Sequence, residues 1–306
     1  MKKNRREFVK ETSAATVAML TSLESISSSS KPIFEMNKNY ELKVLATNWG
    51  YDGNFDNFFA KAKKEGYDGA EIWCPGTDKE RNELAEAASK HSMLLGLLYG
   101  AGDKDLQKNL DDFKKTLNAA AVLKPIYINC HTAKDYFSFE QLKPFFDFSI
   151  QLAKDSGIPI YHETHRGRAC YSAPLTKSFI EKIPGLRITA DLSHWCAVHE
   201  SLLEDQEETL ALVLDRSDHI HARIGFAEGP QVNDPRAPEW EYSVKRHLGW
   251  WDKIAERKKK NGERLTMLTE FGPPDYMWTL PYTRQPLSDQ WAINVHMMQL
   301  LRKRYS

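Results

Sequence analysis

The sequence lacks an excess of charge of either sign. Its 306 residues include 42 lysines and arginines and 42 aspartates and glutamates, so the formal net charge at pH 7 is +0. Proteins that bind nucleic acid mainly through electrostatics carry a basic patch and an excess of positive charge. The balanced charge therefore argues against that class of partner, and we expect no nucleic-acid partner.

Cysteine is also scarce. The four cysteines, at positions 74, 130, 170 and 196, form no C-x-x-C pair. Such pairs are typical of structural zinc and redox sites, and disulfide frameworks are typical of much smaller secreted domains. We therefore expect four free thiols.

Long apolar runs are missing as well. The apolar stretch SAATVAML (residues 13–20) is far shorter than the ~20 residues that cross a bilayer, and we expect no membrane span. It follows NRREFVK, in which Arg5 and Arg6 are adjacent, and this arrangement resembles a twin-arginine export signal. We predict a signal segment over residues 1–30, a linker over 31–39, and export to the periplasm. A disordered basic tail is the alternative interpretation.

The rest of the chain alternates between short apolar runs and longer stretches with helical spacing. Strands are expected over residues 41–49, 69–73, 93–100, 126–131, 158–165, 186–194, 219–226 and 265–272. Helices are expected over residues 54–66, 78–92, 104–123, 138–157, 174–183, 202–217, 249–262 and 288–304. Eight alternating pairs predict an α/β fold, a single-domain (β/α)₈ TIM barrel over residues 40–306. An open doubly wound sheet is the alternative, but no G-x-G-x-x-G follows the first strand.

Ionisable side chains gather where the expected strands end. In IPIYHETHRGRACYSAP (residues 158–174), strand alternation places Tyr161, Glu163 and His165 on one face and His162 and Thr164 on the other. The carboxyl ends of barrel strands meet on one rim, which is where TIM barrels carry their active sites. The residues expected on that rim are His131, Glu163, His165, Asp191, His194, His219, His221, Arg223 and Glu270. Three carboxylates so close together need a counter-ion, and the oxygen-rich set favours Mn²⁺, Co²⁺, Mg²⁺ or Zn²⁺.

Several of these residues also have structural interpretations. A single buried carboxylate is most often paired with arginine, and Arg166 or Arg168 could pair with Asp191 or hold substrate hydroxyls. We expect His219 to be a core histidine and His162 to face the helices. His131 either binds substrate or caps a strand. The side chains of Trp49, Glu71, Trp73 and Trp195 are expected at the barrel mouth, where aromatic rings can stack on sugars.

The rim residues, in this order along the chain, resemble the xylose isomerase-like TIM barrel superfamily. This superfamily of sugar phosphate isomerases and epimerases includes D-tagatose 3-epimerase, inosose dehydratase and endonuclease IV. The resemblance covers residues 40–304 and rests on HETH (Glu163), DLSH (Asp191 and His194), HIHAR (His221) and TEFG (Glu270). It implies one divalent metal ion held by Glu163, Asp191, His221 and Glu270, with both glutamates also moving protons. It further implies that His194 and Arg223 touch substrate, although the spacing of Arg223 matches only approximately.

The remaining expected substrate contacts are His131, His165, Arg168, Trp49 and Gln231, which lies in the loop GFAEGPQVNDPRAPEW. A metal that bridges a carbonyl and a neighbouring hydroxyl makes the C–H between them acidic and stabilises the ene-diolate. We therefore predict a metal-dependent sugar isomerase or epimerase with a small carbohydrate substrate. A 3-keto-glycoside lyase or dehydratase is the alternative because its first step is the same. A nuclease or a non-catalytic sugar-binding protein fits less well. Oligomerisation through the last helix is possible.

Overall fold

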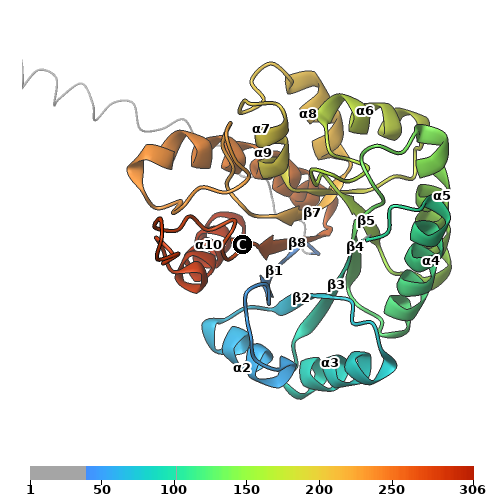
Figure 1. Ribbon diagram of the computed structural model, residues 1–306, viewed down its shortest axis with the longest axis horizontal. Coiled ribbons are helices and arrows are strands. Elements are labelled where there is room, and N and C mark those ends of the chain that lie inside the picture. Colours follow the sequence, from blue (N-terminus) through green and yellow to red (C-terminus); the bar gives the residue numbers. More distant parts are fainter. Residues whose placement is uncertain (1–38, 101) are drawn as a thin grey trace, which may run out of the picture. The chain divides into compact units, whose positions relative to one another are not determined.

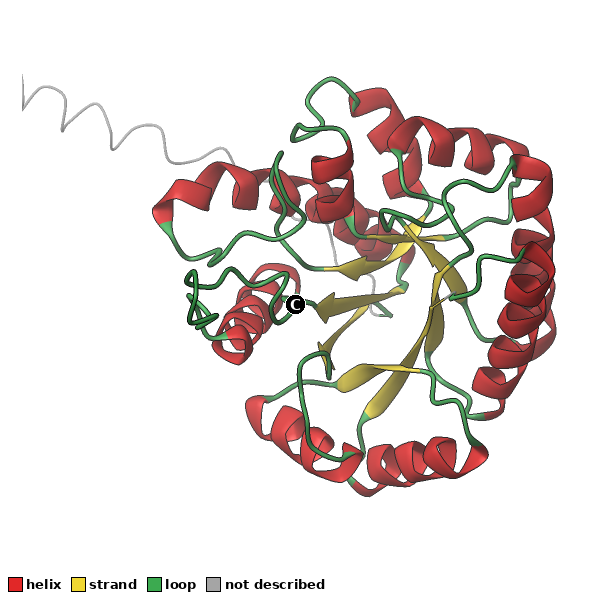
Figure 2. Ribbon diagram, in the orientation of Figure 1, coloured by secondary structure: helices red, strands yellow, loops and turns green. Residues whose placement is uncertain are grey.

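The structure, a computed structural model, describes residues 39–100 and 102–306. The predicted signal segment and all but the last residue of the predicted linker lie outside the described residues. Within them, every strand belongs to one closed parallel barrel in the order β1 to β8 (Figures 1 and 2). The strands are β1 (Glu41–Thr47), β2 (Gly69–Trp73), β3 (Leu94–Gly100), β4 (Tyr127–His131), β5 (Ile160–Glu163), β6 (Ile188–Ala190), β7 (Ser217–His221) and β8 (Arg264–Thr269).

Helices surround the strands on the outside of the barrel, as Figure 2 shows. They are α2 (Phe55–Glu65), α3 (Asp78–Lys90), α4 (Leu106–Val122), α5 (Phe139–Ser156), α6 (Ala173–Lys182), α7 (Leu192–Val198), α8 (Glu207–Asp215), α9 (Glu241–Asn261), α10 (Gln290–Tyr305) and the short 3₁₀ helix η1 (Pro238–Trp240). The (β/α)₈ prediction is therefore confirmed. None of the described helices is both long and apolar enough to cross a membrane.

Local sequence signals explain where several helices begin and end. Helix α3 begins with a capping box, in which Thr77 and Glu80 bond to each other's backbone N–H. Helix α5 begins with the same device and ends at Gly157, whose φ of 72° favours glycine. These caps fix the helix lengths, and hence the point at which the chain returns to the barrel.

The apolar core lies mainly between strands and helices, where alternate strand residues such as Val44 and Ala46 face outward. A smaller apolar cluster is formed by Leu45, Tyr127, Tyr161 and Leu268. The Tyr127 and His219 rings lie 4.2 Å apart, which joins this cluster to a layer of buried polar residues. The barrel interior thus passes from an apolar cluster to the residues that were expected to form the site.

The sixth strand is shorter than predicted. Residues 186–194 were expected to be extended, but β6 ends at Ala190 and helix α7 begins directly after Asp191. The Asp191 side chain accepts the backbone N–H of Ser193 and so caps this helix. The prediction was wrong because the D-L-S-H sequence is a helix start rather than the end of a strand.

Other boundaries also differ. Strand β7 covers Ser217–His221 rather than residues 219–226, and α9 begins at Glu241 rather than at 249. Helix α8 is limited to Glu207–Asp215, whereas 202–217 was expected. The prediction of four free cysteines is confirmed, and Cys130, Cys170 and Cys196 are buried.

Candidate metal centre and active site

Four predicted residues come together at the C-terminal end of the barrel. Each of the residues Glu163, Asp191, His221 and Glu270 offers one donor atom, and these atoms all lie within 4.8 Å of one another. Two ligands of one ion bound at ~2.4 Å can be no more than twice that bond length apart. The spacing is therefore compatible with a single shared ion.

Side chains along strand β5 point alternately toward the helices and into the barrel, and this alternation places Glu163. Its neighbour His162 faces the helices, where Thr132 Oγ1 lies 2.7 Å from Nδ1 and Ser149 Oγ lies 2.8 Å from Nε2. The structure thus confirms that His162 faces the helices. Glu163 consequently points into the barrel, where its side chain is buried.

The two oxygens of Glu163 differ in their surroundings. Oε2 accepts a hydrogen bond from Asn129 Nδ2 at 2.7 Å and lies 2.9 Å from His131 Nε2. Oε1 is buried and has no hydrogen-bond partner among the described residues. A buried carboxylate oxygen without a partner is costly, and a cation bound there would remove the cost.

Asp191 is held by its own helix and by an arginine. Its Oδ1 accepts the Ser193 backbone N–H at 3.1 Å and also the Ser193 hydroxyl, and its Oδ2 contacts Arg223 Nη2. The arginine partner considered for Asp191 therefore exists, but it is Arg223 rather than Arg166 or Arg168. Burial raises the pKa of Asp191 to about 6, and Arg223 opposes this shift.

His221 lies between the two glutamates and a third carboxylate. Its Nδ1 is 2.9 Å from Glu270 Oε2 and 3.4 Å from Glu163 Oε2, and its Nε2 is 3.2 Å from Glu71 Oε1. Burial alone would lower the pKa of His221, but the charges of Glu163, Glu270 and Glu71 outweigh burial and raise it well above its ordinary value. The histidine therefore sits in a strongly negative environment.

The charges of the cluster do not balance. Four buried carboxylates, those of Glu71, Glu163, Asp191 and Glu270, surround one fully buried arginine, Arg223. Counting the half-buried Arg168 as well, and taking His221 as the neutral imidazole that a metal ligand must be, four minus two leaves two formal negative charges. This excess and the unpartnered Glu163 Oε1 fit a divalent cation, and the three carboxylates and one imidazole of the predicted set suit such an ion.

A cavity of about 220 Å³ opens beside this cluster. Its walls include three aromatic rings, a leucine and a threonine together with several polar residues, namely Thr47, Trp49, Glu71, Trp73, Leu98, His131, His165, Arg168, Arg223, Glu270 and Tyr276. The volume is below the ~300–1,000 Å³ of most ligand sites, so it suits a molecule about the size of one sugar ring.

Two of the aromatic walls depend on glycines. A Cβ at residue 272 would lie 2.4 Å from the Trp49 ring, and a Cβ at residue 100 would lie 2.4 Å from the Trp73 ring. Gly272 is in turn held by Gln231, which donates to its carbonyl at 3.2 Å and accepts its N–H at 2.7 Å. The absence of side chains at Gly272 and Gly100 lets both indoles lie against the backbone.

The expected substrate-contacting residues divide into two groups. Trp49, His131, His165, Arg168 and Arg223 line the cavity. His194 and Gln231 are buried and are not among the lining residues. His194 Nε2 lies 2.7 Å from Arg223 Nη2, so His194 contacts the cavity wall from behind.

The structure also corrects one expectation about the mouth. Trp195 was expected there, but it is fully buried and donates its indole N–H to the Cys170 carbonyl. Trp195 lies on helix α7, and the helix turns its side chain toward the core. The prediction had placed a strand end just before this residue and so did not anticipate this direction. Glu71 does reach the cavity, but its carboxylate contacts His219 and His221.

Sequence reasoning missed Asn129 and Tyr276. Tyr127, Asn129 and His131 occupy every second position of β4 and therefore share one face of the strand. The two-residue period of a strand, counted back from His131, could have identified Asn129. Tyr276 comes from the loop after β8, and its ring lies 4.9 Å from the Arg223 guanidinium. No short-range pattern in that loop predicts this contact.

Comparison with known proteins is consistent with the fold. No curated protein is similar enough in sequence to be matched. A solved structure of 3-keto-D-glucoside 4-epimerase from E. coli has a TM-score of 0.57 at 14% identity, covering 86% of this chain and 100% of that one. A probable 3-DHS dehydratase from Bacillus anthracis has a TM-score of 0.55 at 14% identity, with coverage of 86% and 100%. Endonuclease IV from Thermus thermophilus has a TM-score of 0.51 at 12% identity, with coverage of 86% and 97%.

At these identities the structural similarity shows the fold alone. The family assignment rests instead on the sequence, because the family model described as a xylose isomerase-like TIM barrel matches residues 59–239. The match extends over more than half of the chain and includes Glu163, Asp191 and His221. The chain therefore belongs to the xylose isomerase-like TIM barrel family.

Proposed function

We propose that this protein is a divalent-metal-dependent sugar isomerase or epimerase. The observation that carries the proposal is the group of four buried donors, Glu163, Asp191, His221 and Glu270, beside a cavity the size of one sugar ring. When bound there, a divalent ion would polarise the substrate carbonyl and stabilise the negative charge that develops on the sugar oxygens. The similar solved structures include an epimerase, which supports this choice.

Glu270 is the residue best placed to take a proton from carbon. It lines the cavity, whereas Glu163 does not. Glu163 reaches the cavity through His131, whose Nε2 lies 2.9 Å from Glu163 Oε2 and whose ring lies in the cavity wall. Strands β5 and β8 lie three strands apart around the barrel, so the two carboxylates approach the site from different directions. One can remove a proton and the other can return it.

The remaining wall residues bind and orient the sugar. Trp49, Trp73 and Tyr276 offer aromatic faces to its C–H groups, and Arg168 and Arg223 offer N–H donors to its hydroxyls. Because these contacts surround a small cavity, a neutral monosaccharide unit is the proposed substrate class.

A β-elimination by a lyase or dehydratase is the second candidate. It is favoured by His131, which lines the cavity and lies 2.9 Å from Glu163 Oε2, so that it can pass a proton to a leaving oxygen. A dehydratase is also among the similar structures.

Solvent deuterium exchange tests the proposal. We expect the Mn²⁺-loaded protein, incubated in D₂O with a panel of neutral keto-sugars and 3-keto-glycosides, to place deuterium on the carbon beside the carbonyl. Glu270→Gln keeps the side-chain volume but removes the base, and it should slow turnover ~10²–10⁴-fold. NMR of the products distinguishes a deuterated epimer or isomer from an unsaturated elimination product. Full activity of Glu270→Gln with no deuterium in the product would refute proton abstraction.

A further inference from the structure

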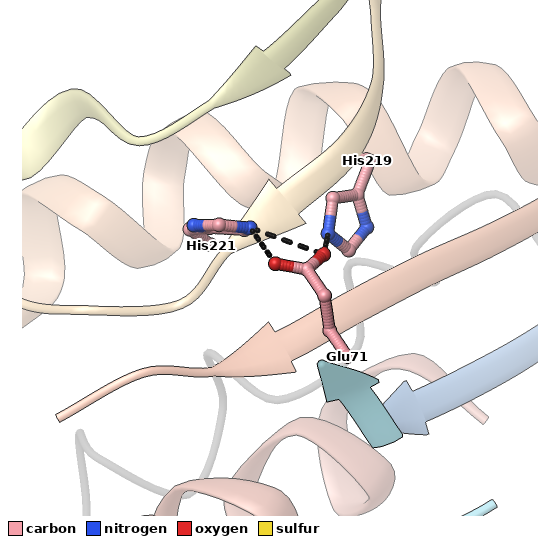
Figure 3. Close-up of side chains that lie close together, drawn as sticks. All are labelled: Glu71, His219 and His221. Atoms are coloured by element: carbon pink, nitrogen blue, oxygen red, sulfur yellow. Dashed lines mark hydrogen bonds and ion pairs between the residues drawn. The ribbon is translucent and has the colours of Figure 1, made fainter. Parts of the chain in front are cut away.

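Glu71 lies between two histidines of the same strand. Figure 3 shows the carboxylate of Glu71, the middle residue of β2, pointing toward both His219 and His221 of β7. Its Oε2 is 3.2 Å from His219 Nε2 and its Oε1 is 3.2 Å from His221 Nε2. All three side chains are buried. Because β2 and β7 are not neighbours in the barrel, this contact crosses the interior.

The two ring nitrogens of His221 face different groups. Nδ1 faces Glu270 and Glu163, at 2.9 and 3.4 Å, which is the side of the four-donor group. Nε2 faces Glu71. A neutral imidazole carries hydrogen on one nitrogen only, and a metal binds the other. The ring can therefore serve the ion only if Nε2 keeps the hydrogen.

We propose that Glu71 is a positioning residue, which accepts the Nε2–H of His221 and thereby presents the Nδ1 lone pair to the divalent ion. This inference rests on the proposed metal site. A carboxylate behind a ligating histidine fixes both the tautomer and the ring orientation, and losing it generally weakens metal binding.

Asn129 is the competitor for the same nitrogen. Its Nδ2 lies 3.0 Å from His221 Nε2, and a donor at this position favours the opposite tautomer. The same amide nitrogen donates to Glu163 Oε2 at the shorter distance of 2.7 Å. An ionised carboxylate is a stronger partner for an N–H than a neutral amide is for a lone pair, so Glu71 decides the tautomer.

His219 lies beside Glu71 but is held by a different partner. Its Nδ1 is 3.0 Å from the Thr266 carbonyl, which can only accept, so Nδ1 carries the hydrogen of this ring. His219 Nε2 lies 3.2 Å from Glu71 Oε2 and makes no hydrogen bond within the described part of the chain. Of the two histidines, His221 is therefore the one that hydrogen-bonds to Glu71, with its Nε2 3.4 Å from Oε2.

The same three residues also have the spacing of a possible metal site, with donor atoms within 4.8 Å of one another. A second ion between them would use His221 Nε2 as a ligand and would exclude the positioning role. Metal stoichiometry separates these two arrangements.

The test compares the full chain with Glu71→Gln, and with Glu263→Gln as the control, because Glu263 lies at the opposite end of the barrel beside Lys258. We expect calorimetric titration with Mn²⁺ to give one tight site in the parent protein and about 10–100-fold weaker binding in Glu71→Gln. Glu263→Gln should bind as the parent does. Circular dichroism of the metal-free proteins checks that both variants fold.

¹⁵N NMR of the Zn²⁺-loaded protein gives a readout independent of affinity. We expect a proton on Nε2 of His221 and none on Nδ1 in the parent protein, and a loss of this pattern in Glu71→Gln. Parent-like Mn²⁺ affinity and an unchanged His221 tautomer in Glu71→Gln would overturn the proposal while leaving the metal site intact. Two ions in the parent, one of them lost in Glu71→Gln, would overturn it in favour of a second site. No tight site in the parent would instead refute the proposed function.

Discussion

Arg223 and Asp191 form an ion pair that is buried at the C-terminal end of the barrel, with 2% and 0% of the two residues exposed. Arg223 also lies 3.5 Å from Glu270 Oε2 and donates from Nε to the Ser193 hydroxyl at 3.1 Å. One guanidinium therefore compensates two of the carboxylates in the four-donor group.

Removing this arginine should leave its carboxylates without compensation. We expect Arg223→Met to lower the free energy of unfolding of the metal-free protein by about 3–5 kcal/mol, the usual cost of breaking a buried pair from one side. Added Mn²⁺ should restore more stability to this variant than it adds to the parent, because the ion replaces the missing positive charge. Urea unfolding with and without Mn²⁺ measures both effects. The control is Arg284→Met, which removes an exposed pair with Asp275 and should change little. Equal losses in both variants would contradict this view.

The packing of Trp49 against Gly272 can be tested by adding one methyl group. A Cβ at residue 272 would lie 2.4 Å from the indole, so Gly272→Ala must displace the ring from the cavity wall. We expect a higher KM for the sugar, a smaller change in kcat, and an altered near-UV circular dichroism spectrum. Gly76→Ala is the matched control, because a Cβ there meets no atom within 4 Å. An unchanged KM in Gly272→Ala would show that Trp49 does not contact the substrate.

At the opposite end of the barrel, Asp218 should make stability depend on pH. Burial opposes its ionisation, but hydrogen bonds and charges from Arg187 and Lys258 outweigh burial and lower its pKa from 3.8 to about 2. A depressed folded-state pKa stabilises the protein above the unfolded-state value, and this contribution is lost as pH falls from about 4 toward 2. The shift corresponds to about 2 kcal/mol.

We therefore expect Asp218→Asn to be at least that much less stable than the parent at pH 7. The difference between the two proteins should shrink at pH 3, because Asp218 of the unfolded parent, with its ordinary pKa of 3.8, then takes up a proton while the folded carboxylate stays mostly ionised. Urea unfolding at pH 7, 4 and 3 provides the comparison. A difference that stays constant over this range would rule out the charge of Asp218 as the cause.

We also propose that the Arg5–Arg6 pair directs export. A twin-arginine receptor reads the guanidinium groups, which lysine does not reproduce. Replacing both residues with lysine should leave the precursor in the cytoplasm, as measured by fractionation of cells that express the full chain. Replacing Lys2 and Lys3 with arginine is the control, because it leaves the pair itself unchanged. Normal export of the double lysine variant would refute this role of the Arg5–Arg6 pair.

Much of the barrel could be predicted because each strand is a compact apolar run and several helices, such as α3 and α5, carry their own caps. The convergence of Glu163, Asp191, His221 and Glu270 followed from the same logic, since parallel strands in a closed barrel end on one rim. The start of α7 at Leu192 was harder to foresee, because LRITA and DLSH form one continuous run in sequence and only the Asp191 cap separates strand from helix.

Contacts across the barrel were beyond prediction for a different reason. Glu71 and His221 are 150 residues apart and come from strands that are not hydrogen-bonded neighbours. Their meeting depends on the barrel's diameter and on the depth of each residue along its strand. The sequence pattern gives the face of each residue but not its partner on the far side.

Strand ends and loops contribute differently to the site. Glu163 ends β5, His221 ends β7, and Glu270 directly follows β8, whereas Tyr276 belongs to a loop and Trp49 lies beyond the end of β1. The proposed metal-binding groups are therefore held by the barrel itself, while part of the cavity wall lies on segments that tolerate insertion and exchange. Evolution, or a laboratory library confined to these loops, can alter what the cavity accepts while the four-donor group is inherited unchanged.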